Sequence, residues 1–268
     1  MNMKKSLLLI VFLPLMLLAE PVEHENILKI KYGGVWQQDS YLSPLRYTGQ
    51  EVGIGNEWWQ SFSRYEHWAH VGMLDIRGCW FANSAKTNKL YGADLQFGWG
   101  AYYHWDWAEQ GVQILLGPYL EAELMGRYMV TNVNKPFSMD AGVQVFAMTG
   151  LRWCFSGKKT SYRLGYTLRA NMIGVDYLPE YFESYYEITE GIHGQARCAG
   201  LWNHQAINQQ LSLDLQFPHS TWRVGLEHQF LNYGTKDMSM QRNQIDLVVG
   251  CIWHYKIHPA KPFKTNRK

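Results

Sequence analysis

Apolar and polar residues alternate one by one over long stretches of this chain. Between Tyr91 and Trp107 every odd-numbered residue is apolar or aromatic, whereas the intervening positions include Asp94, Gln96 and His104. Side chains of a β-strand alternate between two faces, so this period of two predicts a strand with one apolar and one polar face. The segment is far longer than the ~5–6 residues usual in soluble sheets.

The same alternation recurs and predicts ten antiparallel strands. They cover residues 27–36, 47–60, 66–82, 90–107, 111–127, 139–156, 161–175, 206–217, 221–232 and 243–257. The first of these segments has the weakest alternation. We keep this segment as a strand, because an odd number of strands would leave the two chain ends on opposite sides of the membrane.

Charged residues are confined almost entirely to the polar faces of these strands, with Glu66, at a strand edge, as the exception. The polar faces carry nine basic residues: Lys29, Lys31, Arg77, Arg127, Arg152, Arg163, Arg169, Arg223 and Lys256. They carry eleven acidic residues: Glu51, Glu57, Asp75, Asp94, Asp106, Glu121, Glu123, Asp140, Asp214, Glu227 and Asp246. Long apolar faces opposite charged faces are typical of a membrane barrel with lipid outside and a polar lumen. The predicted fold class is therefore all-β: a transmembrane antiparallel up-and-down β-barrel of ten strands, within a range of ~8–12.

The predicted connections alternate between short and long. The short ones are 61–65, 108–110, 157–160 and 218–220, and the long ones are 37–46, 83–89, 128–138, 176–205 and 233–242. Outer-membrane barrels have short periplasmic turns and longer extracellular loops. This pattern predicts that both chain ends lie in the periplasm.

Tryptophans gather near one end of the predicted strands. Seven of the twelve lie on outward faces near the predicted periplasmic ends: Trp58, Trp68, Trp105, Trp107, Trp153, Trp222 and Trp253. Indole rings favour the headgroup zone of a bilayer, so a belt of this kind is expected at a membrane interface. Pro118 lies in mid-strand on the same apolar face, where it cannot donate to the ladder, and we expect a bulge or kink there.

The two ends of the chain differ from the part between them. Residues 1–19 combine Lys4 and Lys5 with an apolar run from Leu7 to Leu18 and a small residue, Ala19, which predicts a signal peptide. Residues 20–257 are the predicted barrel, and 258–268 form a basic tail. The whole chain has 25 basic and 23 acidic residues, so we expect no nucleic-acid partner. Its mean hydropathy of −0.30 excludes a bundle of membrane helices.

Several segments carry a resemblance to a known family. These are YLSPLRYTG (41–49), ESYYEI (183–188), LWNHQ (201–205) and LSLDLQFPHSTWRVGLEH (211–228). The chain resembles the Bacteroidetes outer-membrane family called domain of unknown function 3316, from about residue 30 to the end of the tenth strand. The resemblance implies an envelope protein of a Gram-negative gut-type bacterium, and it supplies no activity and no catalytic residues.

The lumen charges have two interpretations. The acids Glu51, Glu57, Asp75, Asp94, Asp106, Glu121 and Glu123 lie on the second to fifth predicted strands, and Arg152, Arg163, Arg169 and Arg223 lie across the lumen. They could form the selectivity filter of a narrow solute channel, or an internal network of ion pairs that fills the barrel. We favour the filled barrel, since a barrel of ~8 strands has an interior that side chains fill and unpaired buried charge is costly.

Two further features are candidates for chemistry. His104 and Asp106 face the lumen two residues apart, with His254 at a similar predicted depth, and a histidine–carboxylate pair can act as a general base. A barrel enzyme of this kind would act on lipid A or phospholipid. The pair lies at the predicted periplasmic end, away from outer-leaflet lipid A, so polar filling of the lumen is the better interpretation.

The predicted loop 176–205 is the other candidate, because it is much longer than the remaining loops. It is acidic and aromatic, and loops of such length usually carry function or are disordered. Its candidate binding residues are Tyr181, Phe182, Glu183, Tyr185 and Tyr186. A binding surface for a glycan or protein and a lid over the barrel mouth are equally compatible with this composition.

Together these features predict a non-enzymatic outer-membrane β-barrel with a charge-filled lumen and an acidic-aromatic extracellular loop. The expected partners are outer-membrane lipid and, through the loop, a surface glycan or an envelope protein. We expect no cofactor and no metal ion, because the sequence has no nucleotide-binding or metal-ligand motif and its four cysteines are widely spaced.

Overall fold

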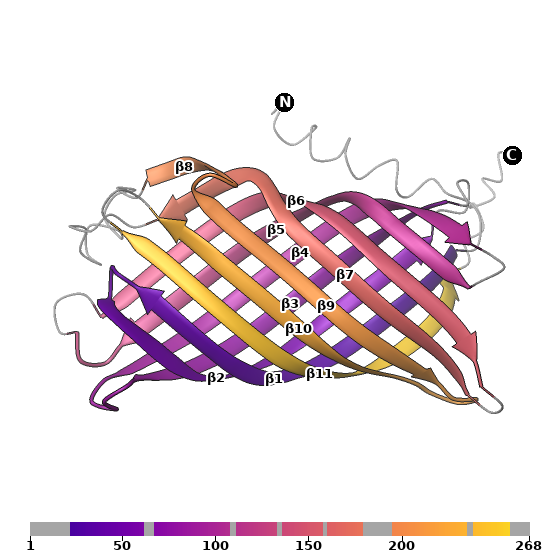
Figure 1. Ribbon diagram of the computed structural model, residues 1–268, viewed down its shortest axis with the longest axis horizontal. Coiled ribbons are helices and arrows are strands. Elements are labelled where there is room, and N and C mark those ends of the chain that lie inside the picture. Colours follow the sequence, from indigo (N-terminus) through magenta and orange to yellow (C-terminus); the bar gives the residue numbers. More distant parts are fainter. Residues whose placement is uncertain are drawn as a thin grey trace, which may run out of the picture.

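The computed structural model describes residues 22–61, 67–107, 111–132, 136–157, 160–178, 195–234 and 238–257. These residues form a closed antiparallel β-barrel (Figure 1). Its strands are β1 (Val22–Asp39), β2 (Ser43–Ser61), β3 (Trp68–Asn83), β4 (Lys89–Trp107), β5 (Val112–Met129), β6 (Phe137–Ser156), β7 (Ser161–Leu178), β8 (Gln195–Gly200), β9 (His204–Gln216), β10 (Thr221–Gly234) and β11 (Ser239–Ile257). No helix among these residues is long and apolar enough to cross a membrane. The predicted signal peptide 1–19 and basic tail 258–268 lie outside the described residues.

The barrel has ten strand positions, as predicted, although eleven strands are present. The short strand β8 pairs with the last part of β7, from Ile173 to Leu178, and β9 pairs with the first part, from Ser161 to Ala170. The two strands therefore occupy one position in succession. The sequence analysis treated β8 as loop, which is wrong, because six residues paired along one neighbour are too short to give a clear alternation.

The barrel closes between its first and last strands. β1 pairs with β11 along its whole length, from Val22 opposite Ile257 to Asp39 opposite Met240. Closure gives each of the ten long strands two hydrogen-bonded neighbours, as a structure surrounded by lipid requires, whereas the short β8 pairs with β7 alone among the described residues. We call the end at which β1 begins and β11 finishes the terminal end (right in Figure 1), and the opposite end the far end.

All ten predicted strands are confirmed, but most of them run further at the far end than the alternation indicated. The expected loops 37–46, 83–89 and 233–242 reduce to 40–42, 84–88 and 235–238. The predicted alternation of short and long connections is therefore wrong, since 40–42 is shorter than 62–67 at the terminal end. Apolar alternation stops where the outer face leaves the lipid, whereas backbone pairing can continue beyond it.

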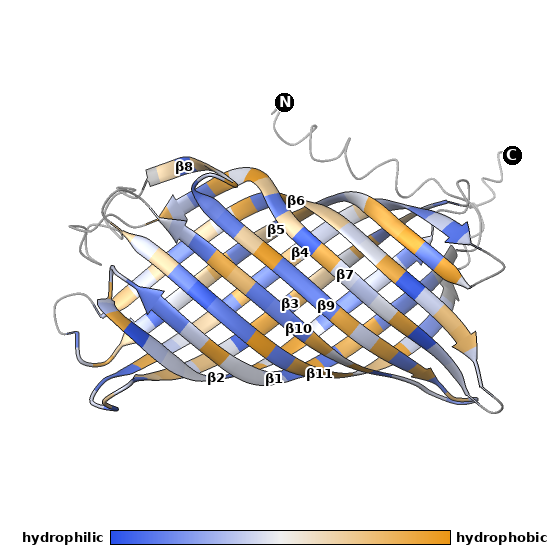
Figure 2. Ribbon diagram, in the orientation of Figure 1, coloured by the Kyte–Doolittle hydropathy of each residue, from blue (hydrophilic) through white to orange (hydrophobic). Residues whose placement is uncertain are grey.

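The two faces of the wall have the predicted polarity. Outward side chains are apolar and exposed, such as Ile30 (62% exposed), Ile76 and Leu226, whereas the inward Lys29 and Lys31 are fully buried. Figure 2 shows this alternation of hydrophobic and hydrophilic residues along the strands. Apolar surface outside and charge inside is the reverse of a soluble barrel and identifies a transmembrane barrel.

The tryptophan belt lies at the terminal end, as predicted. Trp68, Trp105, Trp107, Trp153, Trp222 and Trp253 are all exposed at or near strand ends, and Trp58 is half-buried. The belt marks one boundary of the membrane-spanning zone.

Pro118 is exposed on the outer face, but the expected bulge is absent. The pairing of β5 with β6 runs without a shift through Pro118 opposite Ala147. The missing amide interrupts only the β4 side, where pairing lapses between Gly100 and Tyr103 without a change of register. A bulge occurs elsewhere, where β7 pairs with β6: Met172 of β7 is an extra residue between Asn171 and Ile173.

An apolar cluster lies at the far end of the barrel. The connection between β1 and β2 contributes Tyr41 and Leu42, which are buried. They belong to a cluster with Val35, Tyr47, Cys79, Phe81, Leu90 and Met129. We call it the far-end cluster; it packs apolar side chains against one another inside the barrel, on the side away from the chain ends.

Candidate functional site

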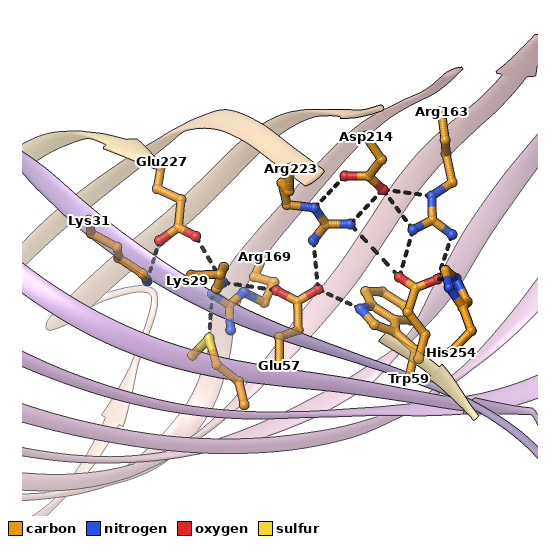
Figure 3. A network of polar contacts seen from close by, with 12 residues as sticks. Lys29, Lys31, Glu57, Trp59, Arg163, Arg169, Asp214, Arg223, Glu227 and His254 are labelled. Carbon is orange, nitrogen blue, oxygen red and sulfur yellow. Dashed lines mark hydrogen bonds and ion pairs between the residues drawn. The ribbon is translucent and has the colours of Figure 1, made fainter. Parts of the chain in front are cut away.

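The middle of the lumen is filled by two lysines and the carboxylates around them. Lys29 Nζ lies 2.9 Å from Glu57 Oε2 and 3.0 Å from Glu227 Oε1. Lys31 Nζ lies 2.8 Å from Asp75 Oδ2 and 2.5 Å from Glu227 Oε2. Figure 3 shows Glu227 with one carboxylate oxygen toward each lysine. Because both lysines belong to β1, their alternate positions direct both ammonium groups into the barrel.

A second cluster, of arginines, joins the lysine cluster on the terminal side. Arg223 donates to both oxygens of Asp214, at 2.6 and 2.9 Å, and to Glu57 Oε1 at 3.2 Å. Arg163 donates to Asp214 Oδ2 at 2.7 Å and to both carboxylate oxygens of Glu25, at 2.6 and 2.7 Å. Glu57 therefore links the lysine cluster to the arginine cluster, and the network is continuous (Figure 3).

Three further arginines add five ion pairs to the filling. Arg242 lies 2.9 Å from Glu51 and 2.5 Å from Asp94. Arg169 pairs with Glu121 at 3.0 Å. Nearer the far-end cluster, Arg127 pairs with Asp140 and lies 3.1 Å from Asp39. Arginine suits such positions because its fork of donors can satisfy two carboxylates at once.

Side chains from opposite walls meet inside the barrel. Gln229 of β10 donates to Gln96 of β4 at 3.1 Å. These strands are five positions apart in the ring of ten, so the contact spans its full width. Arg242 of β11 likewise reaches Met125 of β5, with 3.9 Å between nitrogen and sulfur. The lumen is thus filled from wall to wall at these levels.

The cavities described between these side chains are small. One lined by Glu57, Arg163 and Arg223 has a volume of about 10 Å³. Two others, around Arg127 and around His204, have about 20 Å³ each. A water molecule needs ~10–15 Å³, so each cavity has room for about one water.

The terminal end is more open. A cavity of about 360 Å³ is lined there by His24, Glu25, Trp59, Gln60, Ser61, Tyr102, Arg152, His254 and Tyr255. We call it the vestibule. Its floor is the arginine cluster, because Glu25 both lines the vestibule and accepts from Arg163. The vestibule is lined by aromatic rings and by the guanidinium of Arg152, and it borders the ion-pair network at Glu25.

Most of the predicted lumen residues are found in this network. Glu51, Glu57, Asp75, Asp94, Glu121, Arg163, Arg169 and Arg223 all form ion pairs. The expected pairing of these acids with the arginines opposite holds for Glu121 and Glu57. It does not hold for Glu51 and Asp94, which pair with Arg242, or for Asp75, which pairs with Lys31.

Three of the predicted lumen residues form no ion pair with a lysine, an arginine or a carboxylate of the network, within the part of the chain that the structure describes. Glu123 accepts a hydrogen bond from Gln96 at 2.8 Å. Arg152 places its guanidinium over the ring of Trp59, 3.8 Å from its centroid. Asp106 is partly exposed at the terminal end, where it accepts from Gln113. The candidate loop residues Tyr181, Phe182, Glu183, Tyr185 and Tyr186 lie outside the described residues.

The sequence analysis missed Glu25, Asp39, Asp176 and Arg242, because it placed them outside the strands. The signal was nevertheless present for three of them. Glu25 and Asp39 continue the odd-numbered inward series of Lys29 and Lys31, and Arg242 continues the even-numbered series of Asp246. For Asp176 the signal was masked by the bulge at Met172 of β7, which exposes Met172 and Ile173 in succession.

The histidine pair considered for catalysis is present as a contact. His104 Nδ1 lies 3.0 Å from Asp106 Oδ2. His254 does not join it, since it contacts Glu25 at 3.3 Å instead. Both contacts are at the terminal end, which is the end predicted to face the periplasm.

The wall and the filled interior define a transmembrane β-barrel with a charged, packed lumen. The chain belongs to the family described as protein of unknown function (DUF3316), whose model matches residues 24–261. The resemblance carried by the four sequence segments is thereby confirmed. No curated protein is similar enough in sequence to be matched to this chain.

Several solved outer-membrane proteins are similar in structure to this chain at low sequence identity. The outer membrane protease OmpT from Escherichia coli is 6% identical, with 88% of this chain and 97% of that chain covered and a TM-score of 0.44. The transport unit of the autotransporter AIDA-I from Escherichia coli is 9% identical, with 88% and 90% covered and a TM-score of 0.44. The translocator domain of the autotransporter NalP from Neisseria meningitidis is 10% identical, with 91% and 94% covered and a TM-score of 0.35.

Proposed function

We propose that this protein is a non-enzymatic barrel of the bacterial outer membrane. Its lumen does not conduct ions or solutes, and the surfaces at the two ends of the barrel carry its function. The observation that carries the proposal is the contact between Gln96 and Gln229, which joins opposite walls. A channel requires a continuous water-filled path, and side chains in direct contact across the full width interrupt it. The outer-membrane location is supported by the apolar outer face and the predicted signal peptide, and its partner there is the surrounding lipid.

The arrangement of the charges supports the same proposal. Selectivity filters present rings of like charge to the passing ion. Here Lys29, Lys31 and Arg223 are each held by two carboxylates. Their charges are neutralised locally and face one another rather than an open path. We also propose that the acidic-aromatic segment between β7 and β8 binds a surface glycan or an envelope protein.

Single-channel recording in a planar bilayer tests the closed lumen. The refolded full chain, shown to be folded by its heat-dependent shift on a gel, is expected to give no discrete conductance steps. An open porin inserted in the same bilayer serves as the positive control. Regular, salt-dependent steps from the folded wild-type protein would overturn the proposal and favour the narrow solute channel instead.

Lipid analysis tests the absence of enzymatic activity. Lipid A and phospholipid mass spectra from cells with and without the protein are expected to be identical. A mass change that depends on His104 and Asp106 would contradict the proposal and point to a lipid-modifying barrel enzyme.

A further inference from the structure

Three potential metal ligands converge at the terminal end, outside the lumen network. His67 directly precedes β3, and His104 and Asp106 occupy alternate positions of β4, so their side chains share one face. The backbone amide of His104 donates to the carbonyl oxygen of His67 at 2.8 Å. This bond continues the β3–β4 ladder by one pair beyond Trp68 opposite Tyr103. The ladder therefore fixes the two histidines side by side.

The donor atoms are close enough to hold a single ion. Asp106 Oδ2 lies 3.0 Å from His104 Nδ1 and 3.9 Å from His67 Nδ1, and all three atoms lie within 4.8 Å of one another. Zinc ligands at ~2.0–2.2 Å in tetrahedral geometry are ~3.3–3.6 Å apart. Small side-chain rotations therefore convert the present contacts into coordination.

The carboxylate is also oriented by a neighbour. Gln113 of β5 donates to Asp106 Oδ1 at 2.7 Å, which leaves Oδ2 toward both imidazoles. Metal sites commonly use such outer hydrogen bonds to fix their ligands. The site is accessible, because the His67 side chain is 53% exposed and that of Asp106 35%.

We propose that His67, His104 and Asp106 form a binding site for a divalent transition-metal ion of the Zn²⁺ class. Two imidazoles and one carboxylate suit Zn²⁺, whereas Mg²⁺ and Ca²⁺ prefer sets of oxygen ligands only. Three protein ligands leave a fourth position, which faces the water at the terminal end and takes a water molecule or a ligand atom from outside the chain. The site is independent of whether the lumen conducts.

A second trio shows what distinguishes this site. Glu51, Cys79 and Asp94 also place their donor atoms together, and all three residues are buried. There, however, the guanidinium of Arg242 lies 2.9 Å from Glu51, 2.5 Å from Asp94 and 3.1 Å from the Cys79 sulfur. Arg242 already supplies the positive charge at that trio, whereas no lysine or arginine in the described part of the chain forms an ion pair with Asp106.

Titration of the refolded full chain with ZnCl₂, against a chromophoric chelator, tests the site. We expect one equivalent of Zn²⁺ per wild-type barrel. His67→Asn removes a ligand and is expected to weaken binding by about 100-fold, while Gln113→Leu removes only the orienting bond and weakens it by about 10-fold. His219→Asn changes another exposed histidine, in the turn between β9 and β10 at the same end, and is expected to bind as the wild type does.

Cobalt absorption provides the geometric readout. Co²⁺ in the wild-type barrel is expected to give the visible bands of a four-coordinate ion, and these bands should be lost in Asp106→Asn. Each variant is first shown to be folded by its heat-dependent gel shift. Absence of stoichiometric Zn²⁺ binding to the folded wild type, or equal affinity in His67→Asn, would overturn the proposal.

Discussion

At the scale of single residues, most cations of the interior network contact more than one carboxylate, whereas Arg169 is held by the carboxylate of Glu121 alone among the described residues. Burying a charge is costly unless it is paired and its hydrogen bonds are satisfied. Arg223 illustrates the solution, with two bonds to Asp214 and one to Glu57. Removing such a cation is costly, since its two carboxylates stay buried with fewer partners: Asp214 keeps Arg163, and Glu57 keeps Lys29.

Arg223→Met is therefore expected to be strongly destabilising. We expect a loss of about 3–5 kcal/mol in the free energy of unfolding, the range found when one partner of a buried ion pair is removed. Denaturant unfolding in detergent, followed by tryptophan fluorescence, measures it.

Arg152→Met is the matched control. It also removes an inward arginine, but within the described residues Arg152 stacks on Trp59 without an ion pair. Loss of that stacking should cost only about 0.5–1 kcal/mol. Equal losses in the two variants would mean that the ion pairs do not determine the stability of the interior.

At the scale of the strands, the barrel depends on the seam between β1 and β11. Gly33 faces the lumen at this seam, opposite Asp246. A Cβ at Gly33 would lie 2.0 Å from the carbonyl oxygen of Ile245 and 2.2 Å from Asp246 Oδ1. Only glycine permits so close an approach of the two strands. Its neighbour Gly34 points outward, and a Cβ there would meet nothing within 4 Å.

Gly33→Ala should weaken the seam, and Gly34→Ala should not. Forcing extra atoms into a packed site typically costs about 1–3 kcal/mol. The two variants differ by one position on the same strand, so any general effect of alanine in β1 cancels. The temperature at which each variant loses its folded mobility on a gel provides the comparison. A similar shift in both would contradict the packing argument.

The sequence predicted the strands well and their ends poorly. Period-two alternation reports which residues face lipid, so it found the central part of each strand, such as Tyr91 to Trp107. The alternation weakens in the outer parts of the strands, where outward residues such as Gln38 and Gln241 are polar as well. For this reason Asp39 and Arg242 were assigned to loops although they belong to the interior network. Which residues meet across the lumen depends on the stagger of neighbouring strands around the barrel. The alternation of apolar and polar residues does not report this stagger.

At the scale of the whole molecule, the apolar outer surface and the charged interior have opposite requirements. Ile30, near the middle of β1 and 62% exposed, faces the centre of the bilayer in this arrangement, whereas its neighbours Lys29 and Lys31 face the lumen. A charge is thus well tolerated at one position and costly at the next. The effect of introducing a charged residue on folding should therefore depend on whether its side chain faces lipid or the lumen, and on how far it lies from the middle of the membrane.

Ile30→Arg is expected to impair insertion into the membrane. An arginine on the lipid face near the bilayer midplane costs about 2–4 kcal/mol, and one near the interface about 0–1 kcal/mol. Phe217→Arg, in the turn after β9, is the interfacial control. The folded fraction after refolding into lipid vesicles measures both. Equal folding yields would contradict the assignment of the outer face to lipid.

The contact between Lys29 and Glu227 has a consequence for the order of assembly. These residues belong to the first strand and the penultimate strand, and 198 positions separate them in the chain. While the chain is being assembled, the lysines of the earliest strand can already meet Glu57 and Asp75 of β2 and β3, but their shared second carboxylate, Glu227, arrives only with the last hairpin. An open, partly inserted sheet would expose these groups to hydrocarbon. Closure must then accompany entry into the bilayer, so the barrel should insert as one cooperative unit rather than strand by strand.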